Sequence, residues 1–268
     1  MTEQEFYIGY LKHAPDKNSN FVRNTLIVVF VLIVAAGILL ATHQRKFSNA
    51  VFEYGSDKEY TGVYSDNPVP SIKIINHQDS TGQKINLTIP LVGYGKHGAE
   101  SAIEKFEKEN SVSLSGKLVT FKGDLLYGDG KTLLSLDNEI PIICFELTGE
   151  LADKIVFLGD TVLNGEIIDP KCYFGVMKPG MGKVHRECAI RCISGGIPPV
   201  FRVRAEKTIY HYFLLLGENG ERINQKVLPY VADRIELKGK LFLWGSWMVF
   251  KESGIRLIKQ EHEQRNDY

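Results

Sequence analysis

The sequence contains few cysteines, no excess of charge of either sign and only one long apolar run. Four cysteines and two tryptophans occur among 268 residues, and Lys plus Arg (32) equals Asp plus Glu (32). Balanced charge argues against bulk attraction to nucleic acid or to anionic lipid, so we expect no nucleic-acid partner. The C-x-x-C pair of thioredoxin-like redox proteins is absent, and so is the C-x-x-C-H signature of covalently bound c-type haem.

The apolar run covers residues 25–42, and no charged residue occurs between Arg23 and Arg45. About 18 to 20 apolar residues match the roughly 30 Å hydrocarbon core of a bilayer. A signal peptide is the alternative, but its apolar region is usually only about 7–15 residues long. We therefore expect a polar tail over residues 1–24 followed by an uncleaved transmembrane helix over residues 25–42.

The sequence gives only weak evidence for which end of this helix faces the cytoplasm. Three basic residues lie on each side of the run, so the positive-inside rule is nearly tied: Lys12, Lys17 and Arg23 before it, and Arg45, Lys46 and Lys58 after it. A short N-terminal tail inside and a large domain outside is the commoner arrangement. We expect the rest of the chain on the outer side, where disulfides are permitted.

The remainder of the chain reads as two copies of one β-rich module. A strand-like segment leads to a proline corner in each copy, at Pro68 and Pro70 in the first and at Pro198 and Pro199 in the second. The segments that follow also match in pairs: residues 71–74 with 200–204, residues 89–93 with 213–217, the helical stretches 99–109 and 226–232, and residues 112–118 with 235–241.

Five short strands with a helix between the third and fourth is the order of an OB-fold barrel. Glycines inside the strands, at Gly62, Gly116, Gly165 and Gly239, fit tightly bent barrel strands. We therefore predict a mainly β protein with OB-like modules over residues 52–140 and 155–260, and a charged tail over residues 261–268. Two unrelated antiparallel sheets are the alternative.

The second copy differs from the first by an insert of about thirty residues, here called the cassette (residues 169–199), between its first and second strands. The cassette holds Cys172, His185, Cys188 and Cys192. If residues 184–193 are helical, the last three of these residues share one helix face. Loops at this place in an OB barrel commonly carry ligand contacts.

Three kinds of chemistry fit the cassette. Cys172, His185, Cys188 and Cys192 form a donor set suited to zinc, and soft sulfur also suits copper(I), although the spacing differs from the usual zinc knuckle. A disulfide from Cys172 to Cys188 or Cys192 fits equally well. A thiolate activated by His185, Arg186 or Arg191 is the third reading, but no group that would orient the histidine is evident.

A further set of candidate binding residues combines Arg186 and Arg191 of the cassette with Lys96 and His97. The latter two lie in the glycine-rich turn 93–98, which precedes a helix and could bind an anion at the helix N-terminus. A plain turn is the simpler interpretation of that segment.

The order D-x-K-C-Y-x-G, then H-R-x-C-A-x-x-C-I-x-G-G-x-P-P, resembles a cassette of an uncharacterised family of membrane-anchored or exported bacterial proteins. The resemblance implies a bacterial, envelope-facing protein, so we expect an inner-membrane chain with a periplasmic soluble part. From the anchor, two binding-type barrels and no complete catalytic constellation, we expect a non-catalytic accessory subunit of a larger membrane redox or respiratory assembly, with protein partners there. A thiol- or metal-dependent redox enzyme of the envelope is the alternative.

Overall fold

A computed structural model describes residues 16–43, 50–56, 58–78, 81–137, 143–145, 153–206 and 209–258. The chain divides into two compact units, Met1–Phe47 and Ser48–Tyr268. The predicted C-terminal tail, residues 261–268, and the first part of the predicted N-terminal tail lie outside the described residues.

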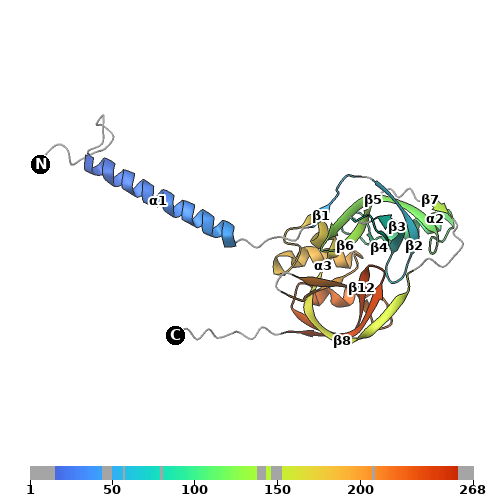
Figure 1. Cartoon of the computed structure of the whole chain (residues 1–268). Helices are drawn as coiled ribbons and strands as arrows, with labels where there is room; N and C mark the ends of the chain where they lie inside the picture. Colours follow the sequence, from blue (N-terminus) through green and yellow to red (C-terminus); the bar gives the residue numbers. More distant parts are fainter. Residues whose placement is uncertain are drawn as a thin grey trace. The chain divides into compact units, whose positions relative to one another are not determined.

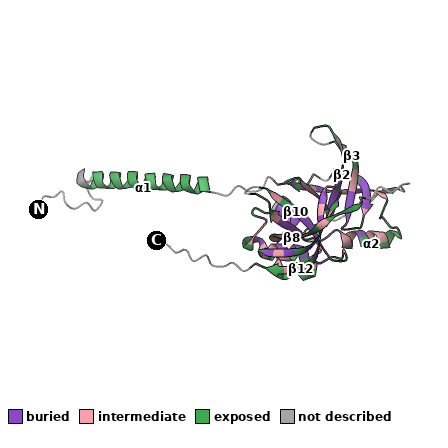
Figure 2. Ribbon diagram, turned by 60° about the horizontal axis from the view of Figure 1, so that its bottom comes forward, coloured by how far each residue is buried: buried purple, intermediate pink, exposed green. Residues whose placement is uncertain are grey.

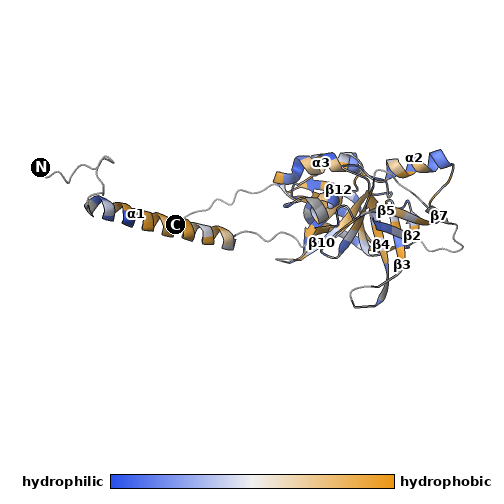
Figure 3. Ribbon diagram, turned by 90° about the horizontal axis from the view of Figure 1, so that it is seen from above, coloured by the Kyte–Doolittle hydropathy of each residue, from blue (hydrophilic) through white to orange (hydrophobic). Residues whose placement is uncertain are grey.

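The first unit contains one helix, α1 (Asp16–His43), within its described residues. Its described side chains are all exposed, and the part Asn18–His43 is long and apolar enough to cross a membrane (Figures 2 and 3). The helix begins before residue 25, so the last part of the predicted polar tail is helical. Length and composition suit a membrane anchor, and a signal sequence near an N-terminus has the same properties.

The second unit contains two β-barrels, confirming the mainly β prediction (Figure 1). The strands of the first barrel are β2 (Lys58–Ser65), β3 (Ser71–Gln78), β4 (Lys84–Val92), β5 (Leu118–Gly128) and β6 (Lys131–Leu136). Helix α2 (Glu100–Asn110) lies between the third and fourth strands. The short strands β1 (Val51–Phe52) and β7 (Ile143–Phe145) both pair with β5.

The second barrel repeats this plan. Its strands are β8 (Ile155–Ile168), β9 (Val200–Arg204), β10 (Tyr210–Gly217), β11 (Ile235–Trp244) and β12 (Trp247–Leu257). Helix α4 (Asn224–Val227) and the 3₁₀ turn η3 (Leu228–Tyr230) lie between its third and fourth strands. In both barrels the third strand pairs in parallel with the fifth and the fourth pairs with the first, which closes the ring in OB order.

The strand registers confirm one part of the predicted internal repeat and correct another. Gly62 and Gly165 occupy equivalent places, since an added Cβ would lie 2.8 Å from Lys73 O in the first barrel and 2.3 Å from Arg202 O in the second. The prediction that Gly116 matches Gly239 is wrong.

The true counterpart of Gly239 is Gly123. An added Cβ would lie 2.2 Å from Ser135 O at Gly123 and 2.1 Å from Lys251 O at Gly239. Gly116 precedes β5 and has a φ of +77°, so it serves a turn rather than a bent strand. The sequence match of residues 112–118 with 235–241 therefore reflects composition, because residues 112–117 are not strand.

The two barrels share one apolar core, to which the cassette contributes. Tyr173 and Phe174 of the cassette are buried there among residues of both barrels: Val69, Leu126 and Leu133 from the first, and Ile168, Val200, Tyr212, Leu214, Leu216, Trp244, Trp247 and Val249 from the second. Around this core, Lys131 Nζ donates to Ser246 O (2.7 Å) and Ser246 Oγ to Thr88 O (2.9 Å). The cassette thus packs at the junction of the barrels.

Candidate metal centre

The cassette folds as three short helical segments between β8 and β9. Cys172–Val176 form a single π-helical turn (η1), Lys183–His185 form a 3₁₀ turn (η2), and Arg186–Ser194 form helix α3. The predicted helix over residues 184–193 is thus confirmed to within two residues at its start. A π-helical turn is rare and often marks a functional site.

These segments bring three predicted ligands together. A ring nitrogen of His185 and the Sγ atoms of Cys172 and Cys188 all lie within 4.8 Å of one another. The two sulfur atoms are 3.9 Å apart and both thiols are free. Two thiolates on a tetrahedral ion at about 2.3 Å would be separated by roughly 3.8 Å. The sulfur spacing therefore fits a shared metal ion.

The histidine side chain points to the same conclusion. Nε2 of His185 is buried and has no hydrogen-bond partner among the described residues, and the whole residue is only 3% exposed. A buried polar atom without a partner costs about 1–3 kcal/mol. Burial also lowers the pKa of His185, against the opposing charge of Asp169. The neutral imidazole is the form that binds metal ions.

Cys192 belongs to a second group of potential ligands. Its Sγ atom, Cys172 Sγ and a carboxylate oxygen of Asp169 lie within 4.8 Å of one another. Asp169 is completely buried; its Oδ1 accepts from Lys171 N (2.9 Å), whereas Oδ2 has no hydrogen-bond partner in the part of the chain that the structure describes. The Cys192 thiol, burial and the Asp169 charge all raise the pKa of Cys172. The four predicted ligands thus form two overlapping groups that share Cys172.

The glycine-rich turn of the first barrel lies against the cassette. Lys171 Nζ donates to Gly93 O (2.6 Å) and to Gly95 O (2.9 Å), and burial lowers the pKa of this lysine. Lys96 Nζ, from the same turn, donates to Cys188 Sγ at 3.5 Å. The backbone N–H of Gly98 donates to Gly195 O (2.9 Å) just after α3. The centre is therefore built from both barrels.

The other predicted binding residues have separate places. Arg186 donates to the Asp233 carboxylate and to Pro229 O (2.9 Å), which fixes the start of α3 against the second barrel. Arg191 and His97 are exposed and belong to neither ligand group. Of these predicted residues, only Lys96 contacts a candidate ligand in the described part of the chain.

Sequence reasoning did not assign a role to Asp169 or Lys171. Both belong to the D-x-K-C order that begins the cassette, and their closeness in sequence to Cys172 is the one feature that could have indicated a role at the same site. A short segment that places a carboxylate, an amine and a thiol within four residues indicates a polar site. It does not indicate that the amine donates hydrogen bonds to the backbone of the other barrel.

A cleft of about 780 Å³ borders the centre. Its lining includes Cys172, Cys188 and Cys192 together with Lys96 and Lys171. The remaining lining residues are mostly aromatic, apolar or acidic: Phe52, Tyr54, Gly55, Tyr94, Gly95, Asp124, Ser135, Leu136, Asp137 and Met177. His185, which is 3% exposed, is not among the lining residues, whereas Cys172 and Cys188 are.

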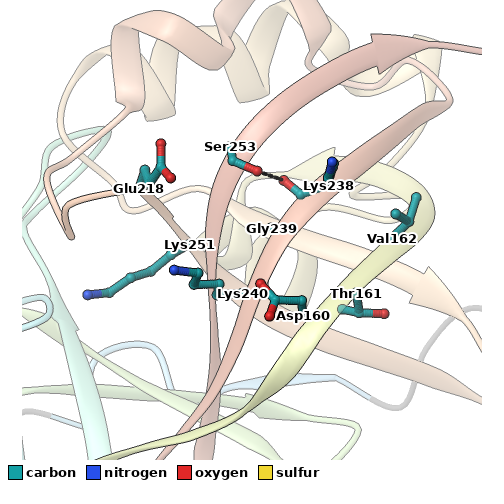
Figure 4. A pocket seen from close by; sticks show the side chains of 9 residues that line it. All are labelled: Asp160, Thr161, Val162, Glu218, Lys238, Gly239, Lys240, Lys251 and Ser253. Atoms are coloured by element: carbon teal, nitrogen blue, oxygen red, sulfur yellow. Dashed lines mark hydrogen bonds between the residues drawn. The ribbon is translucent and has the colours of Figure 1, made fainter.

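A second hollow, of about 210 Å³, lies on the wall of the second barrel (Figure 4). Its lining includes Lys238, Lys240, Lys251, Asp160 and Glu218, and no cysteine or histidine. The charged side chains in Figure 4 spread over the strands rather than converging on one point. Among the described residues, neither group of three potential metal ligands lies in this hollow.

No protein-family model and no curated protein matches the sequence. Among solved structures, the chain is similar to a deletion mutant of the single-stranded DNA binding protein from Thermus aquaticus. The identity is 12%, the match covers 81% of this chain and 92% of that one, and the TM-score is 0.21. A TM-score this low supports no argument about fold or function, so the OB assignment rests on the strand order.

Proposed function

We propose that this chain is a metal-binding protein that holds a thiophilic ion, Zn²⁺ or Cu⁺, at the junction of its two barrels. Cys172, His185 and Cys188 are the ligands. The observation that carries the proposal is that two thiol sulfur atoms and a ring nitrogen of the buried His185 lie within 4.8 Å of one another. Thiolate and imidazole donors suit both ions.

A disulfide accounts for fewer of these observations. Joining Cys172 to Cys188 would use the two sulfur atoms that are 3.9 Å apart, but it would give no role to the ring nitrogen of His185 that lies within 4.8 Å of both. A metal ion uses all three groups. Lys96 near Cys188 would also offset part of the negative charge that two thiolates bring to the centre.

Competition titration of the full chain in detergent tests the ligand set. The purified protein is stripped of metal under reducing conditions and then titrated with Zn²⁺ or Cu⁺ against a chromophoric chelator. We expect one tight site per chain. Cys172→Ser, Cys188→Ser and His185→Ala should each weaken binding by at least about tenfold, because each removes a ligand.

His97→Ala is the matched control for the histidine variant, since His97 is exposed and lies outside both ligand groups. It should bind as tightly as the parent. Equal affinity in the parent, in His185→Ala and in the control would contradict the proposed centre. Circular dichroism of each metal-free variant separates loss of a ligand from loss of the fold.

We also propose that the chain acts as an accessory subunit of a larger membrane assembly. The surface that would contact the partner is a set of exposed apolar side chains on two adjoining strands. Ile155, Val156, Phe157 and Leu158 of β8 are all exposed, and so is Leu243 of the adjoining β11. Contiguous exposed apolar side chains commonly mark an interaction surface. The proposed occupant is a protein subunit of the same membrane, and contact with the lipid surface is the competing outcome.

Native purification in mild detergent tests this second proposal. The parent should co-purify with defined partners, and Val156→Lys with Phe157→Lys should lose them while still binding metal. Val162→Lys, a similarly exposed position farther along β8, is the control. A parent that purifies alone, or variants that lose only affinity for lipid vesicles, would contradict the subunit proposal.

A further inference from the structure

We infer that an ion at this centre keeps one coordination position open toward the cleft, where it binds a small organic anion with an apolar portion. The inference rests on the proposed metal-binding function and specifies the ligand of that same centre. Catalytic zinc sites typically have three protein ligands and one position open to water or substrate, whereas structural zinc sites have four protein ligands.

The ligand geometry places the open position. Cys172 and Cys188 line the cleft, whereas His185 is almost fully buried and is not part of its lining. Because two of the three ligand residues line the cleft and the third does not, we place the remaining coordination position on the cleft side. Cys192 does not close the set, because its sulfur groups with Cys172 and Asp169 rather than with His185 and Cys188.

The walls of the cleft define the class of ligand. At the sulfur end lie Lys96, which is exposed and contacts Cys188, and the buried Lys171. Asp124 and Asp137 also line the cleft, but Asp124 accepts from the N–H groups of Gly55 and Ser56, and Asp137 pairs with Lys122. At the sulfur end, a metal ion beside an exposed ammonium group favours an anionic donor. Phe52, Tyr54 and Tyr94 provide aromatic surface in the same cleft, and Phe52 and Tyr54 contact one another with ring centroids 5.4 Å apart. A volume of about 780 Å³ lies within the roughly 300–1,000 Å³ range of small-molecule sites.

Cobalt substitution provides a direct test. The full chain in detergent is loaded with Co²⁺, whose visible spectrum reports the coordination number, and is titrated with acetate and with benzoate. We expect a saturable spectral change with both anions. Benzoate should bind roughly tenfold more tightly, because its ring is removed from water against the aromatic walls.

Two variants separate the charged end of the cleft from its aromatic part. Lys96→Gln should weaken both anions by roughly fivefold. Tyr54→Ala should weaken benzoate by roughly threefold and leave acetate unchanged. Lys105→Gln is the control, since Lys105 is 73% exposed on α2 and is not part of the cleft; its affinities should equal those of the parent.

The outcomes are distinct. A Co²⁺ spectrum that neither anion changes would show a closed, structural centre and would overturn this inference while leaving the metal-binding proposal intact. Anion binding that is insensitive to both Lys96→Gln and Tyr54→Ala would place the open position away from the cleft and would also overturn it. Failure to bind Co²⁺, Zn²⁺ and Cu⁺ alike would overturn the proposed function and this inference with it.

Discussion

At the residue scale, the buried ammonium group of Lys171 donates hydrogen bonds to the backbone of the other barrel. Its two hydrogen bonds go to the carbonyl oxygens of Gly93 and Gly95, and its backbone N–H donates to the buried Asp169. A lysine is rarely buried without such partners. Lys171 therefore fastens the glycine-rich turn to the cassette and so positions Lys96 beside Cys188.

The first prediction concerns this lysine. Lys171→Met keeps the length of the side chain but leaves the two carbonyl groups without their donor. We expect a loss of about 1–3 kcal/mol in the free energy of unfolding, measured by denaturant titration. Lys105→Met, at an exposed position on α2, is the control and should change stability by no more than about 0.5 kcal/mol. Equal stability of both variants would mean that Lys171 does not fasten the turn.

The second prediction concerns the equivalent glycines Gly123 and Gly239. Alanine at either position would place a methyl group within 2.2 Å of a neighbouring carbonyl oxygen. Backbone cannot yield as a flexible side chain can, so we expect each variant to lose at least about 2 kcal/mol of stability. Gly254→Ala is the matched control on β12, because nothing lies within 4 Å of its added Cβ. Near-neutral behaviour at Gly123 would refute the equivalence.

At the element scale, the cassette connects the two barrels. Its turn η1 places Phe174, which is completely buried, in the shared core, and α3 packs Ala189 and Ile193 against the second barrel. Tyr173 OH lies 3.0 Å from Tyr212 OH, which in turn donates to Asp129 of the first barrel. Apolar packing and a buried polar chain thus hold the same junction.

The third prediction is that Phe174→Ala uncouples the barrels. Removing this ring should cost about 3–5 kcal/mol and leave a cavity at the junction. In calorimetry we expect one unfolding transition for the parent and two for the variant, since each barrel keeps a core of its own. Val184→Ala, at a position 83% exposed in the same cassette, should retain one transition. A single transition in Phe174→Ala would contradict this role.

The elements were largely predictable from the sequence, and the register was not. Local patterns of apolar residues, glycine turns and proline corners were enough for two barrels in OB order and for a helix through Cys188 and Cys192. Strand pairing is non-local. The local likeness of residues 112–118 to residues 235–241 therefore led to the wrong match of Gly116 with Gly239. Equivalence followed only from the carbonyl groups that face Gly123 and Gly239.

The candidate site was predictable in its ligand types but not in its surroundings. Cys172, His185 and Cys188 follow from residue chemistry and helical spacing. The contact of Lys96 with Cys188 joins residues 92 positions apart, and the partition of Cys192 into a second group depends on the turn η1. Neither can be predicted from local sequence. The first results from docking of the cassette on the first barrel, and the second from the packing of η1 against α3 within the cassette.

At the scale of the whole molecule, one apolar helix precedes a pair of fused barrels. The helix belongs to the first unit, and both barrels with the candidate centre belong to the second. Metal binding and membrane attachment can therefore be tested separately.

The fourth prediction concerns the anchor. We expect the full chain to remain in the membrane fraction after alkaline carbonate extraction, and a variant that begins at Ser48 to be soluble. In bacterial cells, protease added to spheroplasts should digest the barrels, as a periplasmic location requires. A mature chain that starts after His43 would identify α1 as a cleaved signal sequence instead, and protection from protease would reverse the proposed orientation.

The most direct test of the central claim is elemental analysis with thiol counting on the natively purified chain. We predict one zinc or copper ion per chain, with the thiols of Cys172 and Cys188 unreactive until a chelator removes the ion. Cys188→Ser should lose the ion and this protection together. A metal-free protein in which both thiols react at once, or are joined as a disulfide, would contradict the account.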